Sequence, residues 1–213
     1  MTAAREYLTA ASIVMGAIAL FAASSPAHAQ TAGRPVEANV GLATMRLSEL
    51  DERNVGVHGT VDVHVARAVA IDAALTWFPG TWNASRSVLD GQGRLLGFVG
   101  VKAAAARPRV ELSGRVGLGF LSFSTQEAPT SCPSQIVTTT LACGLAIGYT
   151  AFTTELGGGS SIALDAGGRV RLRVDAGDLL VRYGSVVARS NGQPTSGFFS
   201  HNFLLSTGIG WRF

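Results

Sequence analysis

The chain has little charge, only two cysteines and no long apolar run in its main body. Charged residues make up 15% of the 213 positions, below the roughly 25% of ordinary soluble domains. After the first thirty positions no stretch of about 18 to 20 apolar residues occurs, which excludes a helical membrane protein for the rest of the chain. A formal net charge of +3 without a basic run gives no support for a nucleic-acid partner. The hydrophobic content of 47% excludes a disordered chain.

The N-terminal segment, residues 1–29, has the pattern of a secretory signal peptide. Arg5 supplies a positive charge, an apolar stretch runs from Ala11 to Ala23, and Pro26 ends it. Ala27-His28-Ala29 then fits the small-x-small cleavage pattern. The apolar stretch is too short for a transmembrane anchor. We therefore expect a cleaved leader and an exported domain over residues 30–213.

Apolar and polar residues alternate along most of this domain. From Val55 to Val65, valine or glycine stands at every odd position and a polar residue or glycine at every even one. That period of two is typical of a strand with one apolar face. The pattern recurs in eight segments, at about 36–43, 55–65, 69–77, 95–102, 110–120, 152–164, 170–175 and 203–213. Short and long connections alternate between them, as in outer-membrane barrels. The sequence predicts an all-β, eight-stranded, antiparallel up-and-down transmembrane β-barrel.

The composition of the polar faces indicates which way they point. They are rich in Gly, Ser and Thr and carry charges of both signs, whereas a solvated surface would carry more Lys and Glu. Eight strands enclose an interior that side chains fill, and charges there have to be paired. We therefore expect the apolar faces to meet lipid. The charges expected in the interior are Asp62, Asp72, Lys102, Glu111, Arg115, Glu155, Arg171, Arg173, Asp175 and Arg212.

The last eleven residues, Phe203–Phe213, end in Phe with apolar or aromatic residues at alternate positions before it. This segment resembles the closing strand of outer-membrane β-barrel proteins, and residues 156–175 resemble the sixth and seventh strands of small OmpA- and OmpW-type barrels. The resemblance implies that the barrel-assembly machinery recognises Leu205, Ile209, Trp211 and Phe213. It also implies residence in the outer membrane, in contact with its lipid, and we expect a monomer.

Cys132 and Cys143 are the only cysteines, and both lie in the connection 123–150. Because export brings them into an oxidising compartment, we expect a disulfide between them. Closing so short a loop contributes about 3 kcal/mol in the chain-entropy treatment. Two free thiols are the alternative.

The histidines are candidate site residues. His58, Asp62 and His64 share one face of an expected strand, which suits either a metal site or an interior hydrogen-bond network. The further ligands of a zinc site are lacking, so we expect the network and no metal or cofactor. His201 lies near Ser200 and Ser206 but on the apolar face, so we expect no catalytic residue. Aromatic girdles at the membrane interfaces are expected from Trp77, Phe78, Trp82, Phe198, Phe199, Trp211 and Phe213.

Together these features predict a non-enzymatic outer-membrane barrel with a structural or surface-interaction role, such as adhesion or recognition. The long connections 79–93, 123–150 and 184–197 would carry that role, and the sequence does not identify their partner. Three alternatives stay open. A transporter of small hydrophobic molecules would need a lateral opening in the wall. A lipid-modifying enzyme would need a Ser/His/acid cluster at one membrane interface. A soluble periplasmic ligand-binding barrel would have the two faces reversed.

Overall fold

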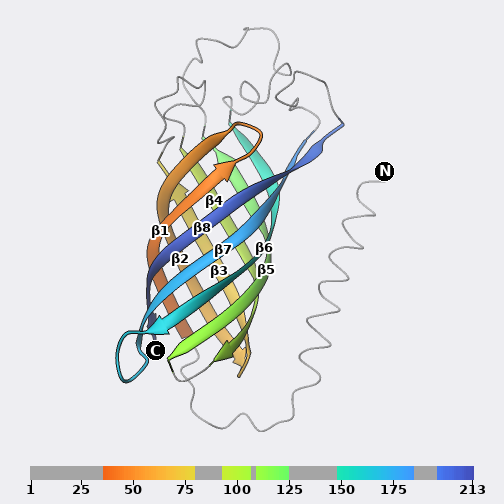
Figure 1. Ribbon diagram of the computed structural model, residues 1–213. Coiled ribbons are helices and arrows are strands. Elements are labelled where there is room, and N and C mark those ends of the chain that lie inside the picture. Colours follow the sequence, from red (N-terminus) through yellow and green to blue (C-terminus); the bar gives the residue numbers. More distant parts are fainter. Residues whose placement is uncertain (1–35, 80–92, 107–108, 125–147, 185–195) are drawn as a thin grey trace. The chain divides into compact units, whose positions relative to one another are not determined.

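The computed structural model describes residues 36–79, 93–106, 109–124, 148–184 and 196–213. Its strands are β1 (Val36–Leu47), β2 (Glu52–Ala66), β3 (Val69–Phe78), β4 (Arg94–Ala106), β5 (Val110–Phe123), β6 (Tyr149–Ala163), β7 (Val170–Tyr183) and β8 (Phe198–Arg212). Each strand pairs antiparallel with the next, and β8 pairs back onto β1 to close the barrel (Figure 1). Among these residues no helix is long and apolar enough to cross a membrane. The predicted eight-stranded up-and-down barrel is confirmed.

The barrel closes along the seam between β1 and β8. Its register runs from Glu37 opposite Arg212 to Arg46 opposite Phe203. Gly41 faces Gly208 across this seam, and a Cβ atom at Gly41 would lie 2.0 Å from a backbone carbonyl oxygen of β8. No side chain fits there without moving one backbone. The absence of a side chain at this position therefore lets the first and last strands approach closely enough to pair.

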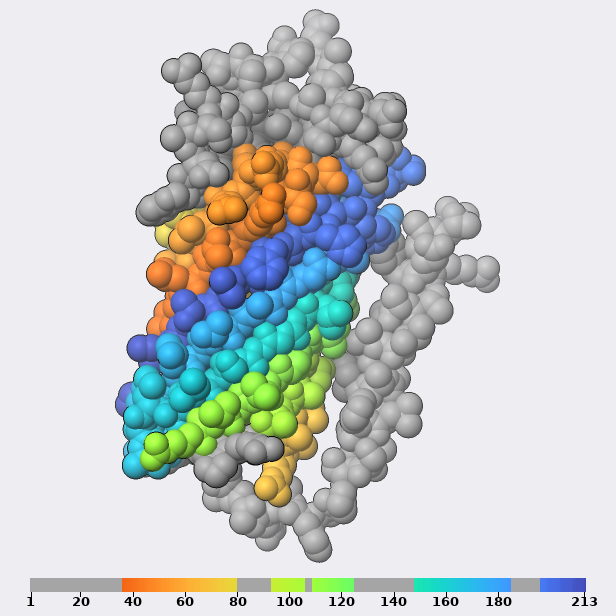
Figure 2. All heavy atoms as spheres, in the orientation of Figure 1, coloured from red at the N-terminus to blue at the C-terminus, as the bar shows by residue number. Residues whose placement is uncertain are grey.

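The outer face of the barrel is apolar. Val40 is 64% exposed and Leu156 68% exposed, and every strand carries exposed large apolar side chains on this face. Figure 2 shows β1, β8, β7, β6 and β5 as one continuous slanting wall. A soluble barrel would bury these side chains inside, whereas a membrane barrel turns them towards lipid. The apolar faces point as predicted.

The interior is divided into two zones, which the sequence analysis did not foresee. The zone near the short turns is charged. The zone near the long connections is a packed apolar cluster of Ala43, Met45, Leu47, Ala74, Phe78, Leu96, Phe98, Leu121, Phe123, Ala151, Leu179, Val181, Tyr183, Phe198 and Leu204. The expectation of a polar lining therefore fails near the long connections, where most of the buried side chains are apolar.

Two of the expected girdle residues are inside. Phe78 is fully buried and Phe198 is 5% exposed. Both strands extend beyond the alternating segments of the sequence, and because side chains alternate between the two faces of a strand, these two rings point inward. The expectation that they lie at a membrane interface is wrong. Phe199, at 49%, and Trp211, also at 49%, are exposed on the outer face together with Trp77 and Phe213. Trp82 lies outside the described residues.

Candidate functional site

The centre of the charged zone is a carboxylate held between two cations. Asp62 on β2 is fully buried. Its Oδ2 accepts from Lys102 Nζ at 2.6 Å and from Arg173 Nη1 at 2.8 Å. Arg173 also donates from Nε to Asp175 at 2.6 Å. These contacts connect β2, β4 and β7 across the interior.

A second group of ion pairs lies at the turn end of the barrel. Arg212 donates to Glu37 at 2.5 Å and to Glu111 at 2.8 Å, so it ties β8 to β1 and β5. Arg171 lies 3.8 Å from Glu111 and donates from Nε to the Ser161 hydroxyl at 2.9 Å. The closing strand is thus fixed by charge as well as by its ladder.

A third group lies nearer the apolar zone. Arg115 on β5 donates to Glu155 at 2.5 Å and lies 3.6 Å from Asp72. Its guanidinium also stands 5.0 Å from the centre of the Phe98 ring, a cation–π distance. All ten charged residues named from the sequence therefore lie on the inner side, nine of them buried and Arg212 with its side chain 19% exposed.

One buried ion pair, inside the apolar zone, joins two residues that the sequence pattern did not place in the interior. Arg94 donates to Glu52 at 2.6 Å and also bonds Asn54, and its guanidinium stands 5.5 Å from the Phe123 ring. Glu52 and Arg94 are the first residues of β2 and β4, outside the alternating segments, so the alternation assigns an inner face to neither. A buried pair of this kind is costly to break from one side.

Of the residues His58, Asp62 and His64, which share the inner face of β2, His58 hydrogen-bonds with the neighbouring strand β3. His58 Nδ1 lies 2.7 Å from Thr76 Oγ1 and the residue is fully buried. Across the part of the chain that is described, no three His, Cys, Asp or Glu side chains come together as metal ligands. The charged zone pairs fixed charges of opposite sign, and such an arrangement cross-links strands.

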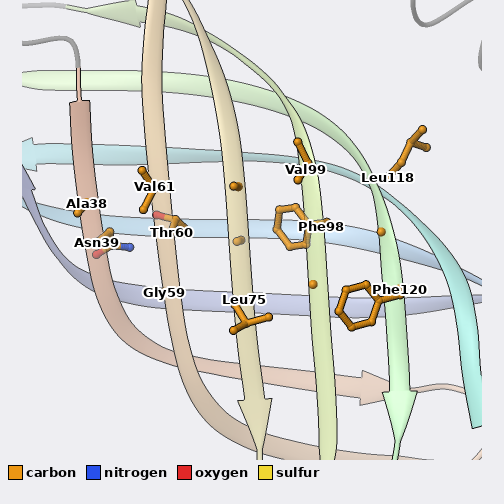
Figure 3. Close-up of a pocket in the computed structure, with 14 residues that line it drawn as sticks. Ala38, Asn39, Gly59, Thr60, Val61, Leu75, Phe98, Val99, Leu118 and Phe120 are labelled. Atoms are coloured by element: carbon orange, nitrogen blue, oxygen red, sulfur yellow. The ribbon is translucent and has the colours of Figure 1, made fainter.

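The outer wall carries a shallow apolar hollow of about 600 Å³ over β1 to β5 (Figure 3). Its exposed rim consists of Val61, Leu75, Val99, Leu118 and Phe120. The five strands beneath it pair through unbroken antiparallel ladders, with one irregularity at the end of β2. The lateral opening that a transporter of hydrophobic molecules would need is absent from this part of the described wall.

A polar group lies on the outer face near the long connections. His201 on β8 places Nδ1 2.6 Å from Asp178 Oδ2 on β7, and Ser48, one residue past β1, donates from Oγ to the carbonyl oxygen of His201 at 2.6 Å. Ser200 and Ser206, the serines nearest His201 in the sequence, face inward and are each 3% exposed. Asp178 and Ser48 were not singled out there.

The remaining predicted residues are outward-facing or undescribed. Leu205, Ile209, Trp211 and Phe213 are between 37% and 63% exposed on the outer face, so lipid or a partner protein has access to them. Cys132 and Cys143 lie outside the described residues, as do the leader 1–29 and most of the three long connections.

Neither a protein-family model nor a curated protein matches the chain. Solved structures do. Neisserial surface protein A is 13% identical with a TM-score of 0.52, over 84% of this chain and 96% of that one. Ail of Yersinia pestis is 14% identical with a TM-score of 0.47, over 84% and 97%. The outer membrane protease OmpT of Escherichia coli is 8% identical with a TM-score of 0.40, over 87% and 99%. The chain has the fold of small outer-membrane β-barrels, and at these identities the likeness shows the fold alone.

Proposed function

We propose that this chain is a monomeric outer-membrane barrel with a non-enzymatic, structural or surface-interaction role, such as adhesion or recognition. The connections that join β3 to β4, β5 to β6 and β7 to β8 leave the barrel at the end opposite the turns that join β2 to β3, β4 to β5 and β6 to β7. In outer-membrane barrels the long connections face the cell exterior. They would therefore form the surface that meets a partner.

The main observation behind this proposal is that the barrel is closed by a paired seam and that its interior is packed with side chains. The seam pairs ten residues of β1 with ten of β8, the loop end is packed with apolar side chains, and the turn end is cross-linked by ion pairs such as Lys102 with Asp62. A rigid scaffold of this kind suits the presentation of loops. The proposal includes cleavage of residues 1–29 on export and recognition of the C-terminal strand by the assembly machinery.

The test is to shorten one connection while leaving the barrel intact. Residues 125–147 would be replaced by a short glycine-containing turn, and cells producing either protein would be compared for autoaggregation and for binding to immobilised extracellular-matrix proteins. We expect the shortened variant to keep its barrel, seen as a gel shift on heating, and to lose binding. Equal binding by both proteins, repeated after shortening 80–92 and 185–195, would contradict a loop-based role.

A further inference from the structure

Three turns at the end of the barrel opposite the long connections each carry an exposed arginine. Arg67 lies in the turn between β2 and β3, Arg109 directly precedes β5, and Arg169 directly precedes β7. The three turns follow one another around the end of the barrel at which β8 finishes (Figure 1). These three residues form an arginine rim, which the loop-based role does not use.

In the described part of the chain, the arginine rim has no carboxylate partner of its own. The ion pairs among the described residues all involve other side chains. Asp165, the one acidic residue in these three turns, accepts the backbone N–H of Val170 at 2.8 Å and so fixes its own turn. At the loop end, by contrast, the exposed Arg46 is paired with Asp51 at 2.9 Å. The positive charge of the rim is therefore available to an external partner.

Backbone hydrogen bonds fasten each of the three turns to the neighbouring hairpin. The carbonyl oxygens of Ala68, Arg109 and Arg169 accept from backbone N–H groups of β4, β6 and β8 at 2.8, 2.8 and 2.9 Å. Ala68 directly follows Arg67. Because the ladders continue into the turns, all three arginines start from fixed backbone positions. Only their side chains have to be ordered when a ligand binds, which lowers the entropic cost of binding.

The arginine rim borders the apolar outer wall. An arginine at the edge of an apolar band lays its carbon stem along the band and keeps its guanidinium at the level of the lipid headgroups. There the guanidinium donates two parallel hydrogen bonds to phosphate oxygens. Exposed wall residues next to the rim in sequence or in register include Val65, Val110, Leu164 and Trp211. The rim thus combines an apolar contact for acyl chains with donors for phosphate.

We propose that the arginine rim selects anionic over zwitterionic phospholipid in the leaflet that surrounds the short turns, which is the periplasmic leaflet in outer-membrane barrels. A zwitterionic headgroup carries its own cation, which cancels the attraction of a guanidinium for its phosphate. An anionic headgroup keeps that attraction, which amounts to about a fivefold preference for one basic residue near the surface. The proposal concerns the end of the barrel opposite the long connections, so it goes beyond the loop-based role and does not rest on it.

The described tryptophans provide one reporter at each end of the barrel, both exposed on the outer face. Trp211 is directly opposite Val170, the residue after Arg169, whereas Trp77 lies at the loop end of β3. Replacing Trp77 and Trp82 by Phe leaves Trp211 as the only tryptophan, and replacing Trp82 and Trp211 leaves Trp77.

The test measures which lipid contacts each reporter. The mature chain, residues 30–213, is folded into phosphatidylcholine vesicles that contain a minor share of brominated phosphatidylglycerol or, in a parallel sample, of brominated phosphatidylcholine. Bromine quenches the fluorescence of a tryptophan that it contacts. At Trp211 we expect about a fivefold preference for phosphatidylglycerol, which weakens at high salt because the attraction is screened.

Two triple variants test whether the charge of the rim causes this preference. Replacing Arg67, Arg109 and Arg169 together by Gln should remove the preference at Trp211, whereas replacing all three by Lys, which keeps the charge, should retain it. Trp77 is the matched control, because quenching at the loop end should be the same in the Gln variant as with the native arginines.

Equal quenching of Trp211 by the two brominated lipids, with the native arginines present, would overturn the proposal. So would a preference that the Gln variant keeps or the Lys variant loses. The comparison of the two lipids with native arginines does not depend on whether the triple variants fold, and the heat shift on a gel checks that each tryptophan variant is a closed barrel. The readout is lipid contact, whereas loop shortening is read out as binding by cells, so failure of either proposal leaves the other standing.

Discussion

Replacing Asp62 by Asn is the sharpest test of the interior network. Asp62 is fully buried and accepts from Lys102 at 2.6 Å and Arg173 at 2.8 Å. Asn keeps the shape of the side chain but removes the negative charge. Breaking a buried pair from one side costs about 3–5 kcal/mol. Lys102 keeps Glu111 at 3.5 Å and Arg173 keeps Asp175 at 2.6 Å, so we expect a loss of about 3 kcal/mol, the lower end of that range.

The measurement is equilibrium urea unfolding of the barrel in lipid vesicles, with Asp51→Asn as the control. The Asp51 pair with Arg46 has side chains 84% and 56% exposed, and exposed pairs contribute about 0–1 kcal/mol. Asp51 has a φ of 49°, a left-handed conformation that Asn also tolerates. If Asp62→Asn destabilises the barrel no more than Asp51→Asn does, the interior ion pairs do not contribute to its stability as argued.

Three further outcomes follow from the fold. Leu118→Arg on the outer face should destabilise the barrel in vesicles by about 2–4 kcal/mol, and Leu164→Arg at the turn end by about 0–1 kcal/mol; equal effects would contradict a membrane-facing wall. Gly41→Val should prevent closure of the seam, seen as loss of the heat shift. In the turn after β6, the Val170 amide donates to Asp165 and holds the pKa of that carboxyl below its usual value. A carboxyl whose pKa is lower in the folded than in the unfolded protein stabilises the fold at pH values above its ordinary pKa of about 3.9. That stabilisation is lost as the pH falls through the pKa of the folded state. The Val170 N–H should therefore lose its protection against hydrogen exchange when the wild-type protein is acidified. In Asp165→Asn its protection should show no such change with pH.

The strands and their faces could be predicted because strict alternation is a local property. In β2 the odd and even positions differ so clearly that the sequence alone assigns Asp62 to the inner face. The loop ends of the strands were harder. Along β7 the alternation fades at Ala176-Gly177-Asp178, and apolar residues then follow on both faces, so nothing local indicates that the strand continues to Tyr183. The apolar zone of the interior was missed for this reason.

The outer polar cluster could not be found from spacing. Ser48 and His201 are 153 positions apart, and only the register of the β1–β8 seam sets them side by side. Ser200 and Ser206 are closer to His201 in sequence, yet the period of two turns both inward. His201 itself was assigned the correct face. What the sequence lacked was the pairing of strands that brings Asp178 and Ser48 to it.

Cell fractionation combined with a heat-shift gel tests the central claim, a closed barrel that spans the outer membrane, most directly. We expect a band in the outer-membrane fraction that migrates differently before and after boiling, because a closed barrel resists detergent until it is heated. A protein that stays soluble in the periplasm and migrates identically with and without boiling would contradict a closed membrane barrel. The apolar faces would then have to line a ligand cavity instead of meeting lipid.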